Sequence, residues 1–216
     1  MEFICRDLGV TDYQATLSAM QTFTKNRTAT TQDELWLTAH YSVYTLGLNH
    51  TDERLPFANK IPTIQSDRGG KITYHGLGQV IIYVLIDLKR RNLKVRELVN
   101  RIESSIVELL QSFNVVANTK KEAPGVYVHE AKIASLGLRI KNKCCYHGLS
   151  LNVDMDLSPF LAIDPCGYQG LLITQTKALG IAETPQALGK VLMQILQKNC
   201  QHDWNKTITH KKNSGA

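Results

Sequence analysis

The chain has 216 residues, of which 43% are hydrophobic and 20% charged, with a formal net charge of +6. This composition is ordinary for a globular protein, and the length allows a substantial core. The longest apolar block, residues 80 to 88, is far too short to span a membrane. Charges at Glu2, Arg6 and Asp7 argue against a signal peptide. The five cysteines are odd in number and form no C-x-x-C, which favours neither a disulfide framework nor a zinc site. We therefore expect a reduced, cytoplasmic protein without a bound metal.

The positive charge admits three interpretations. Nucleic-acid binding is one, but the basic residues are scattered, and they cluster only at Lys89–Arg91 and in the tail "HKKNSGA". An acidic macromolecular partner is the second, and a charge that only serves solubility is the third. For the tail the solubility interpretation comes first. For Lys89–Arg91 a solvated face and an acidic partner stay equally open.

The first half of the chain predicts one helix and three strands. Residues 12 to 25 place Tyr13, Leu17, Met20 and Phe23 near helical spacing, and Thr11 is the expected N-cap. The segments "ELWLTAH" and "SVYTLG" follow as short strands. Residues 80 to 88 are uniformly apolar and rich in Val and Ile, which is typical of a central strand.

The second half predicts two more helices around a group of strands. Residues 94 to 113 form a wide apolar stripe and are the clearest helix. Strands are expected in "GVYV", "KIASLGLRI" and "CYHGLSLNV", with a hairpin turn at residues 129 to 131 and Lys132 at the start of the next strand. A last helix begins with Thr184 as its cap and Pro185 as its first residue.

These elements predict an α+β fold. Strands lie clustered between helices without alternating βαβ units, which favours a mixed, largely antiparallel sheet flanked by helices. No shift in composition divides the chain, so we expect one domain over residues 1–200. Residues 201–216 show no periodicity, and we expect them to be a flexible C-terminal tail.

A glycine-rich stretch, "DRGGKITYHGLGQ" at residues 67 to 79, is the first candidate for a binding site. Neither a P-loop pattern nor a dinucleotide-binding pattern fits it, and a strand rather than a helix follows Gly78. It is either a bulge and hairpin turn, or the wall of a narrow pocket that includes Tyr74 and His75. Its Tyr-His-Gly-Leu recurs at residues 146 to 149. That repeat favours the pocket, formed by two similar edges that face each other across one sheet.

Cys166 is the candidate nucleophile. It stands between Pro165 and Gly167 in "AIDPCGYQG", and such a bend presents a thiol instead of burying it. A free cysteine is most often a small buried hydrophobe, which is how we interpret Cys5 and Cys200. A reactive thiolate needs a nearby cation or hydrogen-bond donor. His75, His147 and Lys132 are the candidates, although a lone lysine that begins a strand is usually solvated.

Several long motifs resemble one enzyme family. The segments "QSDRGGKITYHGLGQVIIYVLIDLKRR", "APGVYV", "KIASLGLRI", "YHGLSLNVDMDLSPFLAIDPCGY" and "DELWLTAH…VYTLG" are similar to those of the lipoyl(octanoyl) transferases, in the same order. The resemblance covers roughly residues 5 to 200. It departs at Leu77, where many members have proline, and at Ser150, where alanine is common. It implies a fold similar to the catalytic domains of biotin and lipoate protein ligases.

The resemblance also implies roles for individual residues. Cys166 would accept the octanoyl group as a thioester, and Lys132 would lower the pKa of that thiol and transfer a proton. The family's acyl-binding residues correspond to Arg68, Gly69, Gly70, Lys71, Ile72, Thr73, Tyr74, His75, Ser135, Leu136, Gly137, Gly148, Leu149 and Ser150. On this basis the two Tyr-His-Gly-Leu stretches are expected to form two walls of an acyl tunnel, with glycines giving clearance to the chain.

The implied reaction takes an octanoyl (or lipoyl) group from octanoyl-acyl carrier protein to a specific lysine. The acceptors would be the lipoyl domains of the 2-oxoacid dehydrogenases and the H protein of glycine cleavage. No cofactor, nucleic acid or membrane is implied, and an acidic carrier would give Lys89–Arg91 a function. An ATP-dependent ligase on the same fold is the nearest alternative, and Cys166 with Lys132 argues against it. A silent acyl- or nucleic-acid-binding module is supported only by the basic charge.

Overall fold

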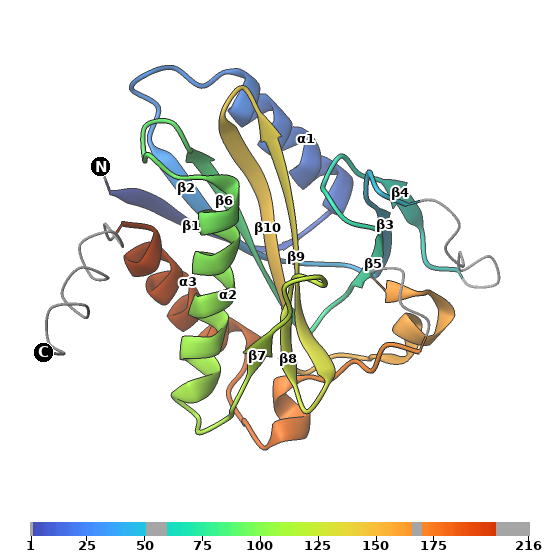
Figure 1. Ribbon diagram of the computed structural model, residues 1–216. Helices are drawn as coiled ribbons and strands as arrows, with labels where there is room; N and C mark the ends of the chain where they lie inside the picture. The colour runs from blue at the N-terminus through green and yellow to red at the C-terminus, as the bar shows by residue number, and fades with distance from the viewer. Residues whose placement is uncertain (1, 51–59, 166–169, 202–216) are drawn as a thin grey trace, which may run out of the picture.

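A computed structural model of the chain describes residues 2–50, 60–165 and 170–201. A mixed sheet crosses the whole molecule, with helices packed on both of its faces (Figure 1). In the described part of the chain its strand order is β1-β2-β6-β10-β9-β8-β7. These strands span Phe3–Thr11, Asp33–His40, Gln79–Asp87, Cys144–Asn152, Ala131–Lys141, Val126–Val128 and Asn118–Thr119. Among the described strands of this sheet only β1 and β2 pair in parallel, so the expectation of a mixed, largely antiparallel sheet is confirmed.

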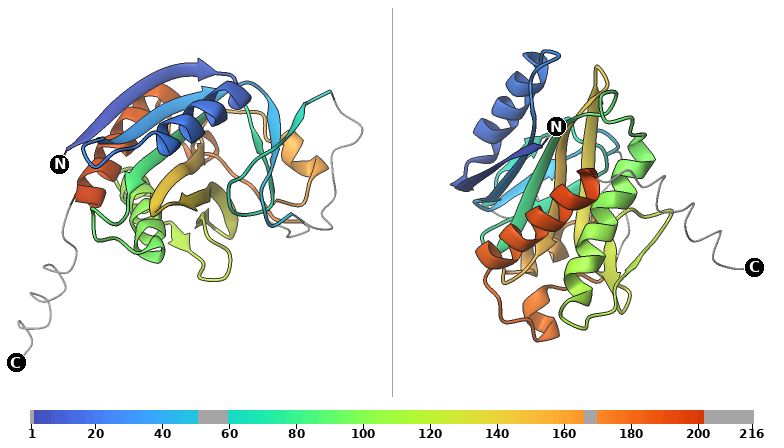
Figure 2. Two further views of the ribbon diagram at one scale, coloured as in Figure 1. Left: turned by 90° about the horizontal axis from the view of Figure 1, so that it is seen from above. Right: turned by 90° about the vertical axis from the view of Figure 1, so that its left-hand side faces the viewer.

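Strand β6 lies inside the sheet, as its apolar sequence predicts. Successive side chains of a strand point to opposite faces, and both faces of β6 are buried. Even-numbered residues such as Ile82 join a core with helices α2 (Val95–Gln111) and α3 (Pro185–Gln201). Odd-numbered residues such as Tyr83 pack instead with helix α1 (Tyr13–Lys25). Two views at right angles show α1 on one side of the sheet and α2 with α3 on the other (Figure 2).

A second, smaller sheet stands beside the first. It has the order β4-β3-β5 in the described residues, with β3 at Val43–Leu46, β4 at Thr63–Gln65 and β5 at Ile72–His75. Strand β5 carries the first Tyr-His pair and β10 carries the second. The two stretches therefore belong to different sheets, and the expectation that they face each other across one sheet is wrong. Short 3₁₀ helices at Ser158–Ala162 and Thr176–Leu179 complete the described elements.

Helix boundaries agree closely with the sequence, apart from one cap. Asp12, not Thr11, caps α1, because its carboxylate accepts the N–H of Ala15 at 2.8 Å. Thr184 caps α3 as predicted, since its hydroxyl accepts the N–H of Ala187 at 3.2 Å. Strand β1 was not predicted from the sequence. It is an edge strand with mostly exposed side chains, so it lacks the buried pattern that marks the interior strands.

The hairpin between β8 and β9 is confirmed and places Lys132 in the second position of β9. His129 and Glu130 form its two-residue loop with φ of 46° and 68°. Both values lie in the left-handed region, as a tight hairpin of this kind requires. Residues 202–216, which include most of the expected tail, lie outside the described residues.

Candidate active site

A pocket opens between the two sheets and is floored by three strands of the large one. The strand register sets Ile81, Ser150 and Ser135 side by side across β6, β10 and β9. Tyr83, Gly148 and Gly137 form the next row. Above the small residues Ser135, Gly137 and Ser150 lies a hollow of about 520 Å³, with its open mouth included. The glycine-rich loop and β5 lie over this hollow.

Most of the residues that the resemblance assigned to acyl binding line this pocket. They are Arg68, Gly70, Lys71, Ile72, Thr73, His75, Ser135, Leu136, Gly137, Gly148, Leu149 and Ser150. Gly69 and Tyr74 are not among its lining residues. Tyr74 turns away and packs with Tyr44 and Phe160 in a separate apolar cluster. His147 lines it as well, as expected for the second Tyr-His-Gly-Leu stretch, whereas three further lining residues were not expected: Tyr13, Ile81 and Tyr83.

The glycine-rich loop is fastened to both sheets. Gly69 donates its N–H to the carbonyl of Leu138 on β9 at 2.8 Å, and the N–H of Leu48 binds the carbonyl of Arg68 at 2.9 Å. The Arg68 guanidinium donates to the carbonyl of Thr45 at 2.6 Å. Arg68 therefore holds the loop against β3, and its aliphatic part covers Gly137, where a Cβ would lie 3.1 Å from the Arg68 Cδ.

The glycines of the repeated motif make room for protein atoms rather than for a ligand. A Cβ at Gly76 would lie 2.4 Å from the Tyr74 hydroxyl oxygen, and one at Gly148 would lie 2.0 Å from the Ile82 carbonyl oxygen. Gly148 thus allows β10 to pair closely with β6. The expectation that these two glycines give clearance to an alkyl chain is wrong, although Gly148 itself does line the pocket.

A half-buried aspartate, Asp67, pairs with the buried His147 of the pocket wall. His147 has φ of 63°, a left-handed conformation that histidine adopts more readily than most residues. Its Nε2 lies 2.8 Å from a carboxylate oxygen of Asp67, which also accepts hydrogen bonds from Tyr146 and Gln21. Burial raises the pKa of Asp67, but these hydrogen bonds outweigh it and leave that pKa well below its usual range.

His75 is neutral in this pocket. Burial, and then the nearby His40, lower its pKa to about 3. Its Nδ1 lies 2.8 Å from Oε1 of Gln79, whose amide nitrogen donates to Asn152 at 2.9 Å. Because the Gln79 oxygen can only accept, Nδ1 of His75 carries the proton. Burial also lowers the pKa of His147 despite Asp67. Neither histidine therefore supplies a positive charge to a thiolate near neutral pH.

Lys132 is buried, in contrast to the solvated lysine that its place at a strand start usually indicates. Its side chain is packed away from solvent, with 1% of the residue exposed. The ammonium donates to the carbonyl of Pro124 at 3.1 Å and lies 5.2 Å from the ring centroid of Tyr127. Gly125 leaves room for it, since a Cβ there would lie 2.8 Å from the Lys132 Cε. The Gly125 φ of 143° also favours glycine.

The segment after the candidate nucleophile pairs with the backbone of Lys132. The backbone N–H of Lys132 donates to the carbonyl of Leu172 at 2.8 Å, and the backbone N–H of Thr174 donates to the carbonyl of Lys132 at 3.0 Å. The Asn152 side chain donates to the carbonyl of Thr174 at 3.0 Å. A chain of hydrogen bonds thus runs from His75 through Gln79 and Asn152 to the strand segment beside Lys132. Cys166 lies outside the described residues.

Sequence reasoning did not assign roles to Gln79, Asn152 or Gly125. Gly125 stands inside the quoted "APGVYV", and Gln79 ends the glycine-rich stretch, so both had a local signal. Asn152 stands inside the quoted "YHGLSLNVDMDLSPFLAIDPCGY", but no local pattern pairs it with Gln79 or Thr174, which are distant in sequence.

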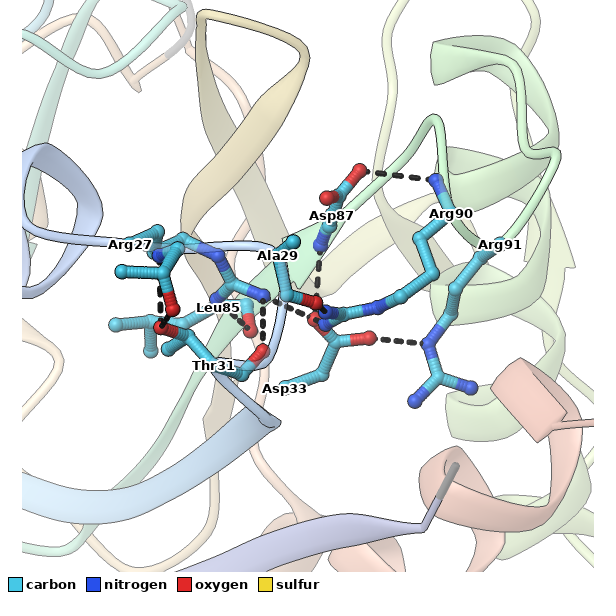
Figure 3. A network of polar contacts seen from close by, with 9 residues as sticks. Arg27, Ala29, Thr31, Asp33, Leu85, Asp87, Arg90 and Arg91 are labelled. Carbon is cyan, nitrogen blue, oxygen red and sulfur yellow. Dashed lines mark hydrogen bonds and ion pairs between the residues drawn. The ribbon is translucent and has the colours of Figure 1, made fainter.

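The basic cluster Lys89–Arg91 is largely used inside the protein (Figure 3). Arg90 and Arg91 form ion pairs with the fully buried Asp33 at 2.6 and 2.5 Å, and Arg27 pairs with the same carboxylate. Only Lys89 of the three is exposed. The two interpretations left open for this cluster, a solvated face and a patch that binds an acidic partner, are therefore both wrong for Arg90 and Arg91.

Comparison with known proteins agrees with this geometry. Residues 12–194 match the lipoyl protein ligase A/B catalytic domain. This chain belongs to that family. It is 53% identical over 201 residues to a protein of Dechloromonas aromatica named octanoyltransferase, covering 91% of this chain and 98% of that one.

Solved structures show the same fold at low identity. A lipoate-protein ligase A bound with ATP has a TM-score of 0.77 at 13% identity, covering 92% of this chain and 85% of its own. A biotin protein ligase from Aquifex aeolicus has a TM-score of 0.54 at 12% identity, and the match covers 92% of this chain and 68% of the ligase. The predicted likeness to these catalytic domains is confirmed. None of the described helices is long and apolar enough to cross a membrane.

Proposed function

We propose that this protein is an octanoyltransferase that moves an octanoyl group from acyl carrier protein to a lysine of a lipoyl domain, through a thioester on Cys166. The observation that carries the proposal is the buried Lys132, three residues along β9 from Ser135 in the pocket wall. Relatives that are 53% and 51% identical to this chain are named octanoyltransferase. An acyl chain in the pocket has its reacting end beside Lys132.

In the first half-reaction the Cys166 thiolate attacks the carbonyl carbon of the donor thioester. The bond from that carbon to the carrier's sulfur breaks, and the carrier leaves as a thiolate that takes up a proton. Lys132, as an ammonium, stabilises the Cys166 thiolate before the attack. Exchange of one thioester for another is nearly balanced in energy, so this step needs no nucleotide.

In the second half-reaction the amine of the acceptor lysine attacks the acyl-Cys166 carbonyl. The carbon–sulfur bond breaks, an amide forms, and Cys166 leaves as a thiolate. Lys132, neutral after giving its proton to the departing carrier thiolate, takes up the proton that the amine loses and becomes an ammonium again. Formation of an amide from a thioester is downhill, which makes the overall transfer irreversible in practice. The lipoyl domains of the 2-oxoacid dehydrogenases and the H protein of glycine cleavage are the proposed acceptors.

Intact-mass measurement tests the proposal. Mixing the protein with octanoyl-acyl carrier protein, without nucleotide, should add one octanoyl group that hydroxylamine removes. Cys166→Ala should lose both the adduct and the transfer to a lipoyl domain. Cys200→Ala is the matched control, because burial raises the pKa of that thiol to about 12 and makes it unreactive. An adduct on another cysteine, or a requirement for ATP, would contradict the proposed mechanism.

A further inference from the structure

A second groove runs along the outer edge of β9, beside the acyl pocket. It lies between the glycine-rich loop, the first turns of α2 and the loop that precedes β8. Lys71, Val95, Val99, Pro124 and Leu136 are among its lining residues. With open solvent at its mouth included, it holds about 1020 Å³, the size of a small-molecule site rather than of a protein interface.

The backbone of β9 is open to a ligand in this groove. Strand β8 pairs with β9 only as far as Ala134. Further along, the carbonyl of Leu138 accepts the N–H of Gly69. Alternate residues of a strand direct their N–H and C=O groups to the same edge. Leu136, midway between those two residues, therefore presents its peptide groups to the groove, where β8 has already ended.

The groove and the acyl pocket share a wall and converge at the reacting end. Gly70, Lys71, Leu136 and Gly137 line both. Pro124, which lines the groove, accepts the hydrogen bond of the Lys132 ammonium at 3.1 Å. A substrate whose reactive carbonyl lies at Lys132 thus has two channels to occupy, one over the face of β9 that carries Ser135 and Gly137 and one along the outer edge of β9.

We propose that this groove binds the thiol-bearing arm of the donor, a linear pantetheine chain with two amides. The inference rests on the proposed function, because a thioester at Lys132 has an acyl side and a sulfur side. The acyl side fills the pocket, so the sulfur side needs the other channel. Amides of the arm pair with the open peptide groups of Leu136 as an added strand would. Val95 and Val99 pack against its methylene and methyl groups.

The test compares two soluble donors that differ in the length of the arm. Octanoyl-pantetheine carries both amides, whereas octanoyl-N-acetylcysteamine ends after the first. The variant Val95→Trp fills the groove from α2, and Val191→Trp on α3 is its matched control, because both valines are 44% exposed. Rates of acyl-Cys166 formation are followed by mass, with melting temperatures recorded for each variant.

Val95→Trp should lower kcat/KM for octanoyl-pantetheine about tenfold and leave kcat/KM for octanoyl-N-acetylcysteamine within about twofold of the wild type. Val191→Trp should change kcat/KM for neither donor. Equal loss for both donors, or no loss for either, overturns the inference. Unchanged loading with slower transfer to a lipoyl domain also overturns it, since the groove would then bind the acceptor. If the wild type forms no acyl-enzyme with any octanoyl thioester, including the carrier-bound one, the proposed function fails first.

Discussion

Lys132 is held in place by residues that sequence spacing alone does not bring near it. Its ammonium is fixed by the carbonyl of Pro124, and its chain crosses the space that Gly125 leaves open. His75 and His147, the other two candidates, are kept neutral by burial. At the scale of single residues, the described structure therefore favours Lys132 as the cation for Cys166.

Lys132 variants should separate loading from transfer. A thiol with an ordinary pKa of about 8.5 is only a few per cent thiolate at neutral pH, and an adjacent ammonium lowers that pKa by about one or two units. Lys132→Met should raise the apparent pKa of Cys166 in iodoacetamide alkylation and slow acyl loading. Lys132→Arg keeps the charge but gives up a proton poorly, so it should load and then fail in transfer.

The control for Lys132 is Lys177→Met, since that lysine is exposed and pairs with Asp154. An alkylation profile of Cys166 that does not move in Lys132→Met would leave the thiolate without its proposed cation.

Two glycines in one row of the sheet should behave differently when changed. A Cβ at Gly148 meets the Ile82 carbonyl oxygen at 2.0 Å, so Gly148→Ala forces β10 away from β6. We expect a loss of stability of about 3 kcal/mol or more, seen as a lower midpoint in urea. The nearest atoms to a Cβ at Gly137 are the Arg68 Cδ and the Gly69 carbonyl oxygen, both at the longer distance of 3.1 Å. The Gly137→Ala protein should therefore fold with little loss of stability, but Cys166 should accept the octanoyl group more slowly than in the wild type. A Gly148→Ala protein of wild-type stability would show that β10 has room to move.

The Asp33 cluster joins three separate elements. Asp33 begins β2, Arg27 follows α1, and Arg90 with Arg91 follows β6. The same buried Asp33 carboxylate also accepts a hydrogen bond from the backbone N–H of Asp87 at 2.9 Å. The cluster lies at the Lys141 end of β9, because Cys144 pairs with both Lys141 and Asp87. Nine residues of strand, about 30 Å, separate it from Lys132, so it stabilises the fold rather than the site.

Removal of the Asp33 charge should destabilise the protein without changing its chemistry. Asp33→Asn leaves three buried or half-buried guanidiniums without their counter-charge, which costs about 3–5 kcal/mol. Urea unfolding measures the loss, and acyl loading of the folded fraction should match the wild type. Lys89→Ser, at the exposed neighbour, should leave the unfolding midpoint unchanged. A midpoint that Asp33→Asn does not lower would mean that the arginines find other partners.

For the molecule as a whole, buried neutral histidines predict a loss of stability in mild acid. The pKa of His75 is about 3 in the folded protein and near the ordinary 6.5 when unfolded. Between those values the unfolded chain binds more protons, so stability falls as pH drops below 6.5. From pH 7.5 to 5.0 the loss from His75 is about 2 kcal/mol. Burial lowers the pKa of His40 and His147 and adds in the same direction.

Urea unfolding at the two pH values checks this expectation. His75→Gln should lose about 2 kcal/mol less than the wild type on acidification, whatever its stability at pH 7.5. His129→Gln, in the exposed hairpin loop, is the control and should follow the wild type. An equal loss in His75→Gln and wild type would indicate that His75 is charged in the folded state.

Much of this protein is determined by its sequence alone, because helices and interior strands follow from local periodicity. The apolar block that became β6, the stripe of α2 and the Thr184-Pro185 start of α3 needed no tertiary information. The long motifs around Lys132 and Cys166 likewise carried the family.

Only the tertiary structure decided where those elements meet. It set β5 and β10 in different sheets, buried Lys132 against Pro124, and paired Arg90 and Arg91 with Asp33. It also showed that Gly148 serves the approach of β6 rather than a ligand. Each of these contacts joins residues far apart in the chain or depends on how closely two strands pack. Burial, pKa and clearance are properties of such contacts, and no local pattern of residues encodes them.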